Sequence, residues 1–443
     1  MNFLRCFVFL VSIVAAAQTK YTIKAHFNAV ANQEVMLKGF NAREEIILDK
    51  STTDSNGNFT ITYPADYTGA ALLEITKGKK LIVLLNHENF EISWNDQNTM
   101  TGLRFTNSPE NIAFDAGLLL YQDTQEKKAG IVYLTPYYVN DDVKSQFFKT
   151  ELNVLSKAVP NYVNSLSSKS YVSYYLKIRV LIADFQTSLK RYPDDISELE
   201  KQFNKLDFDD ERLLHSGLYT ELLETFIISM ENHYGEKKYE HLNSGILSVL
   251  KSLKPLPEVK QNTAEYIFNT LEKRSLFESS EHLALAMLTD DSCKLDDKHQ
   301  ALFEQYRKMA KGHTAPDIVF TDAQKSKLSD LKRKYKLVIF GASWCPKCVE
   351  EIPKFKAFYA DWKKNYDLEI IFISLDTERK DYENFIKDFP WLSSCDFTGW
   401  ESKAVRDYCV FATPTMYLLD ATNKITVKPI SADQVNSWLK VRQ

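Results

Sequence analysis

Apolar residues in the first part of the chain alternate with polar ones. Tyr21, Ile23 and Phe27 follow this pattern, and a turn-forming cluster at 54–58 precedes a second alternating segment. Alternation with a period of two is typical of a strand with one buried face. With further short apolar runs the pattern predicts about seven strands. We therefore expect a small antiparallel β-sandwich over residues 18–105.

The spacing of apolar residues changes after this region. Val154, Leu155, Ala158 and Val159 recur at the intervals of a helix turn, and few prolines interrupt the pattern. This periodicity is typical of amphipathic helices. The sequence therefore predicts an all-α middle region over residues 106–310.

The last region, residues 311–443, alternates between the two patterns. Apolar runs of strand length predict buried strands at 337–340 and 368–375. Regular alternation of strands with helices is typical of an α/β sheet. The other predicted elements are a short strand at 318–320, helices at 349–362, 382–389 and 432–441, and closing strands at 415–419 and 424–427.

The N-terminus has the pattern of a secretory signal peptide. Arg5 precedes the apolar run 6–14, and Ala15-Ala16-Ala17 offers small residues for cleavage. The apolar run is too short to span a bilayer. We expect residues 1–17 to be removed near Ala17 and the mature protein to be exported.

Composition places the chain among globular proteins. Hydrophobic residues make up 44% of the 443 residues and charged residues 26%, with a formal net charge of −4. The chain has no basic excess of the kind that nucleic-acid binding requires. We therefore expect no nucleic-acid partner.

The candidate chemistry lies at Trp344-Cys345-Pro346-Lys347-Cys348, between a predicted strand and a predicted helix. A strand that delivers Cys-x-x-Cys to a helix start is the layout of a dithiol redox centre. A thiolate there faces unpaired N–H groups and the positive end of the helix dipole, which favours the charged form. The second cysteine lies one turn further on, within reach of a mixed disulfide held on the first.

Two other interpretations of this Cys-x-x-Cys are weaker. Zinc usually takes four nitrogen or sulfur ligands, and the last third of the chain adds only His299 and His313, which lack the spacing of a ligand pair. A purely structural disulfide that closes so short a loop stabilises a fold little. We expect no metal at this site.

The remaining cysteines leave alternatives open. Cys395 and Cys409 form a second disulfide or stay two separate buried thiols, and sequence alone does not decide between them. Cys293 lies in a polar stretch and is expected to be a loop thiol. Cys6 belongs to the predicted signal peptide.

Three segments of the last region resemble one family. Residues 340–353 contain Trp-Cys-x-x-Cys followed by Glu-x-Pro, residues 315–317 are Ala-Pro-Asp, and residues 408–420 contain Ala-Thr-Pro-Thr. Together they resemble the TlpA/ResA-like exported branch of the thioredoxin superfamily. The β and helical regions upstream resemble multidomain members from Bacteroidetes-type bacteria. The resemblance implies a thioredoxin-like fold for residues 311–443.

The resemblance implies roles for the motif residues. Cys345 is expected to be the exposed nucleophile and Cys348 the more buried resolving thiol. Glu351 shares a helical face with Cys348 and is expected to tune the cysteines and relay protons. Ile339 supports that role, because it stands where ordinary thioredoxins carry a buried Asp. The alternative for Glu351 is an ordinary acidic residue in a first helical turn.

The dipeptide between the cysteines departs from the branch, which often has Pro directly before its second cysteine. Here Pro346 follows the first cysteine and Lys347 precedes the second. Lys347 favours a thiolate through its charge, or faces solvent with little effect. We expect both residues to tune the reduction potential.

Two prolines complete the resemblance. Pro353 is expected to kink the active-site helix, and Thr413-Pro414 is expected to be a cis peptide. In the family the backbone before the second proline pairs with an extended substrate segment. Thr413 and Pro414 are therefore predicted to bind substrate, with Trp344 as an apolar contact surface.

The function implied is that of a periplasmic thiol:disulfide oxidoreductase acting on protein thiols and disulfides, without a metal or organic cofactor. Reduction is the favoured direction, with electrons from a membrane thiol carrier. A thiol peroxidase is the first alternative, but it expects Pro and Thr where Val338 and Ala342 stand. In the second alternative residues 18–308 bind a partner and the thioredoxin-like domain is accessory.

Overall fold

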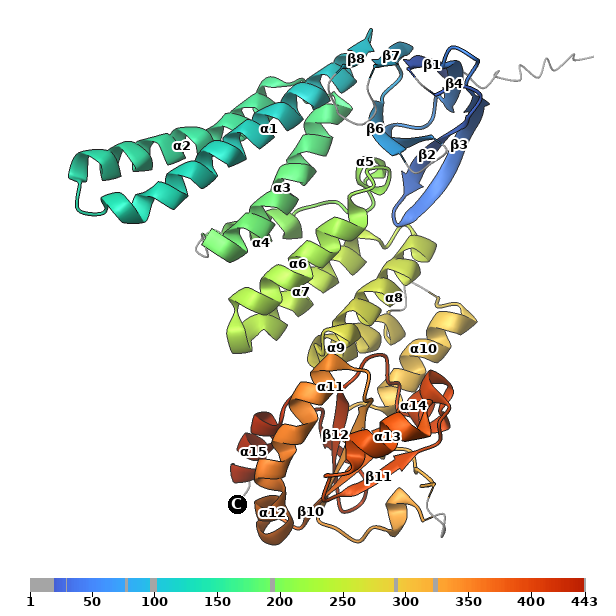
Figure 1. The fold of residues 1–443 in the computed structure, drawn as a ribbon. Coiled ribbons are helices and arrows are strands. Elements are labelled where there is room, and N and C mark those ends of the chain that lie inside the picture. Colours follow the sequence, from blue (N-terminus) through green and yellow to red (C-terminus); the bar gives the residue numbers. More distant parts are fainter. Residues whose placement is uncertain are drawn as a thin grey trace, which may run out of the picture. The chain divides into compact units, whose positions relative to one another are not determined.

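The computed structural model describes residues 20–28, 30–75, 79–95, 102–191, 196–290, 294–321 and 326–441. The predicted signal peptide at 1–17 and Cys293 lie outside the described residues. The chain, drawn in Figure 1, separates into two compact units. The first comprises Met1–Leu199 and Asp207–Phe226, and the second Glu200–Leu206 and Ile227–Gln443.

The first unit begins with two four-stranded sheets, of order β4-β1-β7-β8 and β3-β2-β5-β6. Strand β1 pairs antiparallel with β4 but parallel with β7, so the expectation of a purely antiparallel sandwich is wrong. A parallel pair needs a crossover connection, and the strands of the other sheet lie between β1 and β7 in sequence. The strands are β1 (Lys20–Phe27), β2 (Glu34–Asn41), β3 (Glu44–Thr52), β4 (Asn58–Pro64), β5 (Gly69–Ile75), β6 (Lys79–Leu85), β7 (Phe90–Trp94) and β8 (Leu103–Thr106).

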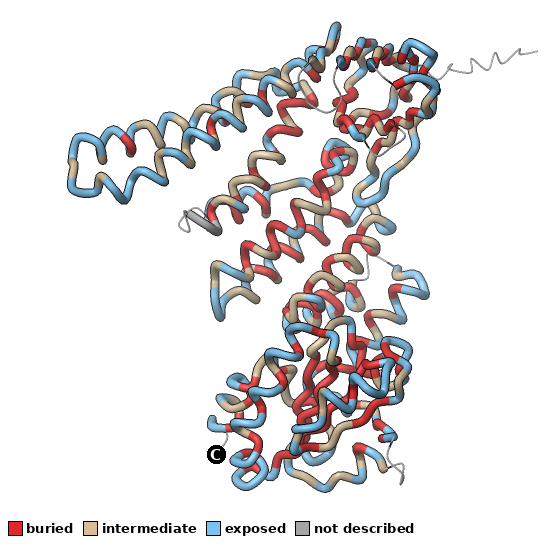
Figure 2. The backbone as a smooth tube through the Cα atoms, in the orientation of Figure 1, coloured by how far each residue is buried: buried red, intermediate tan, exposed pale blue. Residues whose placement is uncertain are grey.

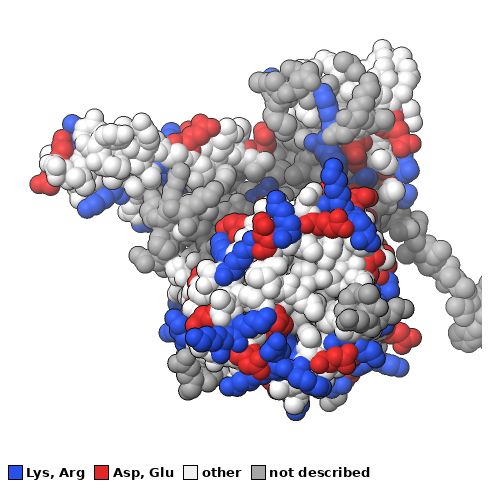
Figure 3. Space-filling view, turned by 60° about the horizontal axis from the view of Figure 1, so that its bottom comes forward, with Lys and Arg blue, Asp and Glu red and all other residues white. Residues whose placement is uncertain are grey.

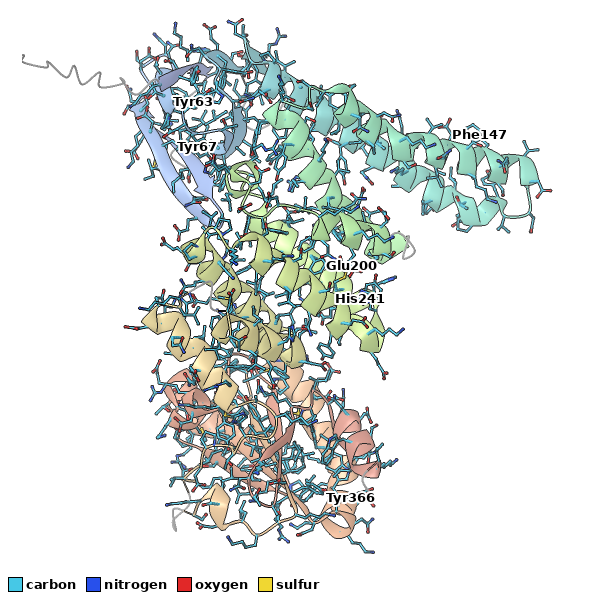
Figure 4. All side chains as sticks on the ribbon, turned by 180° about the vertical axis from the view of Figure 1, so that it is seen from behind. Tyr63, Tyr67, Phe147, Glu200, His241 and Tyr366 are labelled. Carbon is cyan, nitrogen blue, oxygen red and sulfur yellow. The ribbon has the colours of Figure 1, made fainter. Side chains whose placement is uncertain are left out.

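The two sheets share one hydrophobic core. Ile23 and Phe27 of β1 are buried in it together with Leu37 of β2, which belongs to the other sheet. Buried tyrosines satisfy their hydroxyls at its edge: Tyr63, labelled in Figure 4, donates to the Glu88 carbonyl at 2.8 Å. The sandwich predicted from alternating residues is confirmed.

Helix α1 (Pro109–Leu134) is tied to the sandwich at its first turn. Its N-cap Ser108 accepts a hydrogen bond from the Asn111 N–H at 3.2 Å. The buried Asn111 amide exchanges two hydrogen bonds of 2.8 Å with the backbone of Leu84, on the edge strand β6. Beyond this start, α1, η1 (Thr135–Tyr138) and α2 (Asp142–Ser165) form a largely exposed hairpin (Figure 2) that carries Phe147 (Figure 4).

The all-α middle region is confirmed, and helices α4 (Ile196–Asn204) and α6 (Tyr219–His233) each begin in the first unit and end in the second. In the second unit Glu200 accepts from Tyr234 at 2.8 Å and lies 2.9 Å from His241 Nδ1, and Figure 4 labels Glu200 and His241. The first unit also holds α3 (Tyr171–Arg191) and α5 (Glu211–Leu214). The second holds η3 (Gly235–Lys237), α7 (Lys238–Ser252), α8 (Pro257–Lys273), α9 (Phe277–Leu288) and α10 (Asp297–Lys308).

The C-terminal part of the second unit is built on a five-stranded sheet of order β11-β10-β9-β12-β13. Strand β9 pairs parallel with β10 and antiparallel with β12. All of β10 and nearly all of β9 are buried, as expected of central strands covered on both faces. The strands are β9 (Tyr335–Gly341), β10 (Leu368–Ser374), β11 (Leu392–Cys395), β12 (Thr415–Asp420) and β13 (Ile425–Val427). The helices are η4 (Leu328–Asp330), α11 (Pro346–Glu351), η5 (Ile352–Phe355), α12 (Lys356–Asn365), α13 (Arg379–Ile386), η6 (Gly399–Glu401), α14 (Lys403–Asp407) and α15 (Ala432–Lys440).

Two predicted elements differ in the structure. The short strand expected at 318–320 is only a single bridge between Val319 and Lys327. The helix expected at 349–362 changes to a 3-10 turn, η5, at Pro353, because proline lacks the N–H that continues an α-helix. The helix is thus interrupted at Pro353, and the predicted kink stays a prediction.

Two further properties concern the surface. Within the described ranges, no helix has both the length and the apolar character needed to cross a lipid bilayer.

On the face drawn in Figure 3, Lys and Arg are interspersed with Asp and Glu. This mixed surface differs from the single-sign stripe that follows a nucleic-acid backbone.

Candidate active site

Cys345 ends the loop after β9 and caps α11. Its backbone is extended, with φ −88° and ψ 112°, and its Sγ accepts a hydrogen bond from the Cys348 N–H at 3.2 Å. Pro346 occupies the start of the helix, where its missing N–H costs nothing. The local chain therefore places a backbone donor against the sulfur that has to carry negative charge during thiol exchange.

Cys348 is fully buried behind Cys345. Burial, and next the neighbouring Cys345 sulfur, raise the pKa of the Cys348 thiol to about 12. Gly341 leaves the space for this sulfur: a Cβ there would lie 3.3 Å from Cys348 Sγ and 2.8 Å from Ile352 Cδ1. At neutral pH Cys348 is consequently held as a thiol in a tightly packed site.

Cys345 was expected to be exposed, and that expectation is wrong. Only 5% of its surface is accessible, because the loop that carries Thr413 lies over the sulfur. The Cys345 thiol donates a hydrogen bond to the Thr413 carbonyl at 3.3 Å. The Thr413-Pro414 peptide is cis, as predicted. Residues far apart in sequence are thus brought together at the dithiol.

Trp344 forms the exposed flank of the dithiol. Its side chain is 53% exposed, and its ring centroid lies 6.3 Å from that of Trp400 in η6. The sequence analysis missed Trp400, which lies in a stretch without regular periodicity. Both rings are exposed, and Trp344 directly precedes Cys345.

Asp376 is a second residue that the sequence analysis missed. It is buried just after β10, and its carboxylate accepts from the Ser343 N–H at 3.1 Å, from Ser343 Oγ at 2.6 Å and from Ser374 Oγ at 2.6 Å. Ser343 lies two residues before Cys345. Polar residues that follow neighbouring parallel strands meet at one sheet edge, which is the signal that points to Asp376.

Comparison with known proteins places this site in a family. A family model described as thioredoxin-like matches residues 332–425. A thiol-disulfide oxidoreductase ResA from Bacillus cereus is 30% identical over 147 residues, which cover 32% of this chain and 84% of the relative. The chain belongs to the thioredoxin-like thiol-disulfide oxidoreductases. It is accordingly an enzyme of the oxidoreductase class.

Other oxidoreductases of the family show the same similarity. The ResA of Bacillus subtilis (strain 168) is 26% identical over 147 residues, 32% of this chain and 78% of that protein. A solved thiol-disulfide oxidoreductase from Bacteroides fragilis NCTC 9343 is 32% identical. It covers 29% of this chain and 99% of its own, with a TM-score of 0.27.

In this oxidoreductase the carboxylate of Glu351, the last residue of α11, accepts two hydrogen bonds. It accepts from Lys354 Nζ at 2.8 Å and from the Ala432 N–H, at the start of α15, at 3.3 Å. Pro346 and Lys347 are exposed beside the dithiol. The roles of Glu351 in proton transfer and of the dipeptide in tuning the potential stay predictions.

The other described cysteines of the oxidoreductase are unpaired. Cys395 donates to the Asp376 carbonyl at 3.2 Å. Burial raises the pKa of Cys409 to about 12. They are two separate buried thiols, so the alternative of a second disulfide is not realised. Among the described residues no group of three or more His, Cys, Asp and Glu side chains is arranged to hold a metal ion.

Proposed function

We propose that this oxidoreductase is exported to the periplasm and reduces disulfides of protein substrates through Cys345 and Cys348. The observation that carries the proposal is the position of Cys345 Sγ between the Cys348 N–H and the Thr413 carbonyl. This position gives the sulfur a donor for its charge and sets it beside a backbone segment that a substrate strand can meet.

The reaction proceeds in two exchanges. The Cys345 thiolate attacks one sulfur of a client disulfide, so that the client S–S bond breaks and a Cys345–client bond forms. The other client sulfur leaves as a thiolate and takes a proton. Cys348 then loses its proton and attacks the Cys345 sulfur, which releases the reduced client and leaves a Cys345–Cys348 disulfide.

Each turnover leaves the enzyme oxidised, and a membrane thiol carrier restores the dithiol by becoming oxidised itself. Residues 1–17, with the pattern of a signal peptide, support a site of action outside the cytoplasm, where client disulfides persist. The reducing direction rests on the resemblance of residues 340–353 to the TlpA/ResA-like branch.

The direction of the reaction is tested by measuring the reduction potential of the dithiol. The full-length protein is equilibrated with glutathione and dithiothreitol buffers, and mass spectrometry gives the fraction that carries the Cys345–Cys348 disulfide. We expect a potential near that of thioredoxin, about −270 mV. Cys345→Ser abolishes the transition, while Cys395→Ser, which removes a buried thiol that does not belong to the dithiol, leaves it unchanged. A reduction potential of about −120 mV, which is that of a strong oxidant, would contradict the proposal that the enzyme acts as a reductase.

A further inference from the structure

The loop of residues 408–414, which ends in Thr413 and Pro414, is held by helices that lie outside the thioredoxin-like sheet. The ring of Phe268, on α8, meets the ring of Phe411 edge to face, with centroids 6.0 Å apart. Gln305, on α10, donates through Nε2 to the Arg406 carbonyl at 2.7 Å, just before the loop. Helices α8 and α10 thus contact the segment that lies over Cys345.

A buried polar network fastens the same helices to the end of the sheet. Lys428, just after β13, donates to the Tyr306 hydroxyl of α10 at 3.0 Å, and this hydroxyl in turn bonds Glu272 of α8. Ser280 of α9 also bonds Glu272. Burial raises the pKa of Glu272 and lowers that of Lys428. Buried groups of this kind are costly to separate, so the network holds the helices in one position against the sheet.

Phe411 faces two environments. One side of its ring packs on the fully buried Phe268, and 36% of its surface remains exposed. Phe411 lies two residues before Thr413, whose carbonyl contacts Cys345 Sγ. A ring that is packed on one side and exposed on the other offers a preorganised apolar contact to a client segment bound at Cys345.

Other hydrophobic side chains near the dithiol are also exposed. Trp344 precedes Cys345, Val349 lies on the first turn of α11, and Trp400 packs beside Trp344, all of them exposed. Aromatic anchors of this kind dominate binding at protein interfaces. Because Cys345 is only 5% accessible, a client sulfur reaches it with its neighbouring side chains against this apolar surface.

We infer that Phe268 is a positioning residue for Phe411, and that Phe411 selects extended client segments that carry an apolar side chain next to the reacting cysteine. The inference rests on the proposed function, in which clients are protein disulfides. It gives helices α8 and α10 a part in substrate choice.

The test compares two peptide disulfides that differ only in a Leu or a Ser beside the reacting cysteine, with cystine as a small disulfide that makes no such contact. The reduced full-length protein is mixed with each in a single turnover, and the second-order rate constant for formation of the Cys345–Cys348 disulfide is measured. We expect about a tenfold preference for the Leu peptide, since burying one apolar side chain is worth that much discrimination. Phe411→Ala and Phe268→Ala abolish the preference and lower the Leu-peptide rate more than the cystine rate, and Phe268→Leu restores most of the preference.

Leu271→Ala is the matched control, since it removes a fully buried side chain from the same helix and should leave the preference unchanged. If Phe268→Ala fails to fold, which circular dichroism shows, the exposed Phe411→Ala variant still decides the selection. A preference retained in both alanine variants would overturn the inference, and so would an equal loss of cystine and peptide rates. Failure of the wild type to reduce any of the three disulfides would instead refute the proposed function.

Discussion

At the scale of single residues, the two thiols of the redox pair differ in their surroundings. Cys345 caps a helix, touches the Thr413 carbonyl and keeps a small accessible surface. Cys348 lies fully buried against Gly341, and its pKa is raised to about 12. This asymmetry matches the division of work in which one sulfur meets the client and the other resolves the mixed disulfide.

The raised pKa of Cys348 predicts its alkylation. Iodoacetamide reacts with thiolates, so at pH 8 the reduced protein should be labelled at Cys345 and not at Cys348. Labelling of Cys348 should rise about tenfold per pH unit, because its thiolate fraction does so below the pKa. Peptide mapping by mass spectrometry measures alkylation at both cysteines. The peptide alkylated at Cys348 is identified by its absence in the Cys348→Ser variant. Equal labelling of the two cysteines at pH 8 would contradict the assignment.

The same shift has a consequence for stability. The folded pKa of Cys348, about 12, lies above the ordinary value of 9.0. Below pH 9 the protonated Cys348 therefore makes its full contribution to the stability of the reduced protein. This contribution is lost as the pH rises toward the folded pKa, because Cys348 ionises first in the unfolded chain. The free energy of unfolding of the reduced protein should fall over this range, and less so in Cys348→Ser.

At the scale of elements, the site lies where β9 and β10 end side by side. The Asp376 carboxylate, after β10, fixes Ser343 in the loop after β9, and this loop leads into Cys345. Cys395 of β11 also bonds the Asp376 carbonyl. The ends of three neighbouring strands are thereby joined through Asp376, by its carboxylate and by its backbone carbonyl.

Removal of this carboxylate should destabilise the active-site loop. Asp376→Ala leaves the Ser343 N–H and two hydroxyls without their acceptor, and we expect a loss of about 3 kcal/mol in the free energy of unfolding. Asp420→Ala is the control, because Asp420 accepts comparable bonds from Thr422 and Lys424 at an exposed turn. Its loss should stay near about 1 kcal/mol. Urea titration of the reduced proteins measures both, and equal losses would refute the role of Asp376.

The sequence predicts those elements best whose local pattern agrees with their packing. The runs 337–340 of β9 and 370–373 of β10 are apolar and buried, so they predict these strands directly. β11 was missed, because its sequence Leu-Ser-Ser-Cys is half polar and is specified by pairing with β10. Apolar and polar residues alternate in the same way along parallel and antiparallel strands. The alternation therefore does not predict that β1 and β7 run parallel.

The candidate site divides in the same way. The Cys-x-x-Cys and the cis Thr413-Pro414 peptide are readable from motifs. Asp376 and Phe268 carry no motif, and only the folded chain brings them to Ser343 and to Phe411. Such contacts join residues that are distant in sequence, so local sequence patterns do not predict them.

At the scale of the whole molecule, the second compact unit contains helices α7 to α10 together with the thioredoxin-like sheet. The predicted domain boundary near residue 310 stays a prediction, and the unit contains chain on both sides of it. Through the Phe268–Phe411 contact and the Lys428 network, the middle helices pack against the loop 408–414 and the end of the sheet.

Attack by Cys345 and resolution by Cys348 are tested most directly by trapping the mixed disulfide. The full-length Cys348→Ala variant, reduced and then mixed with a peptide disulfide, should accumulate one peptide on Cys345. Dithiothreitol should release this peptide, and the variant that also carries Cys345→Ala should form no adduct. Absence of a mixed disulfide, or its location on Cys395 or Cys409, would contradict the proposed mechanism.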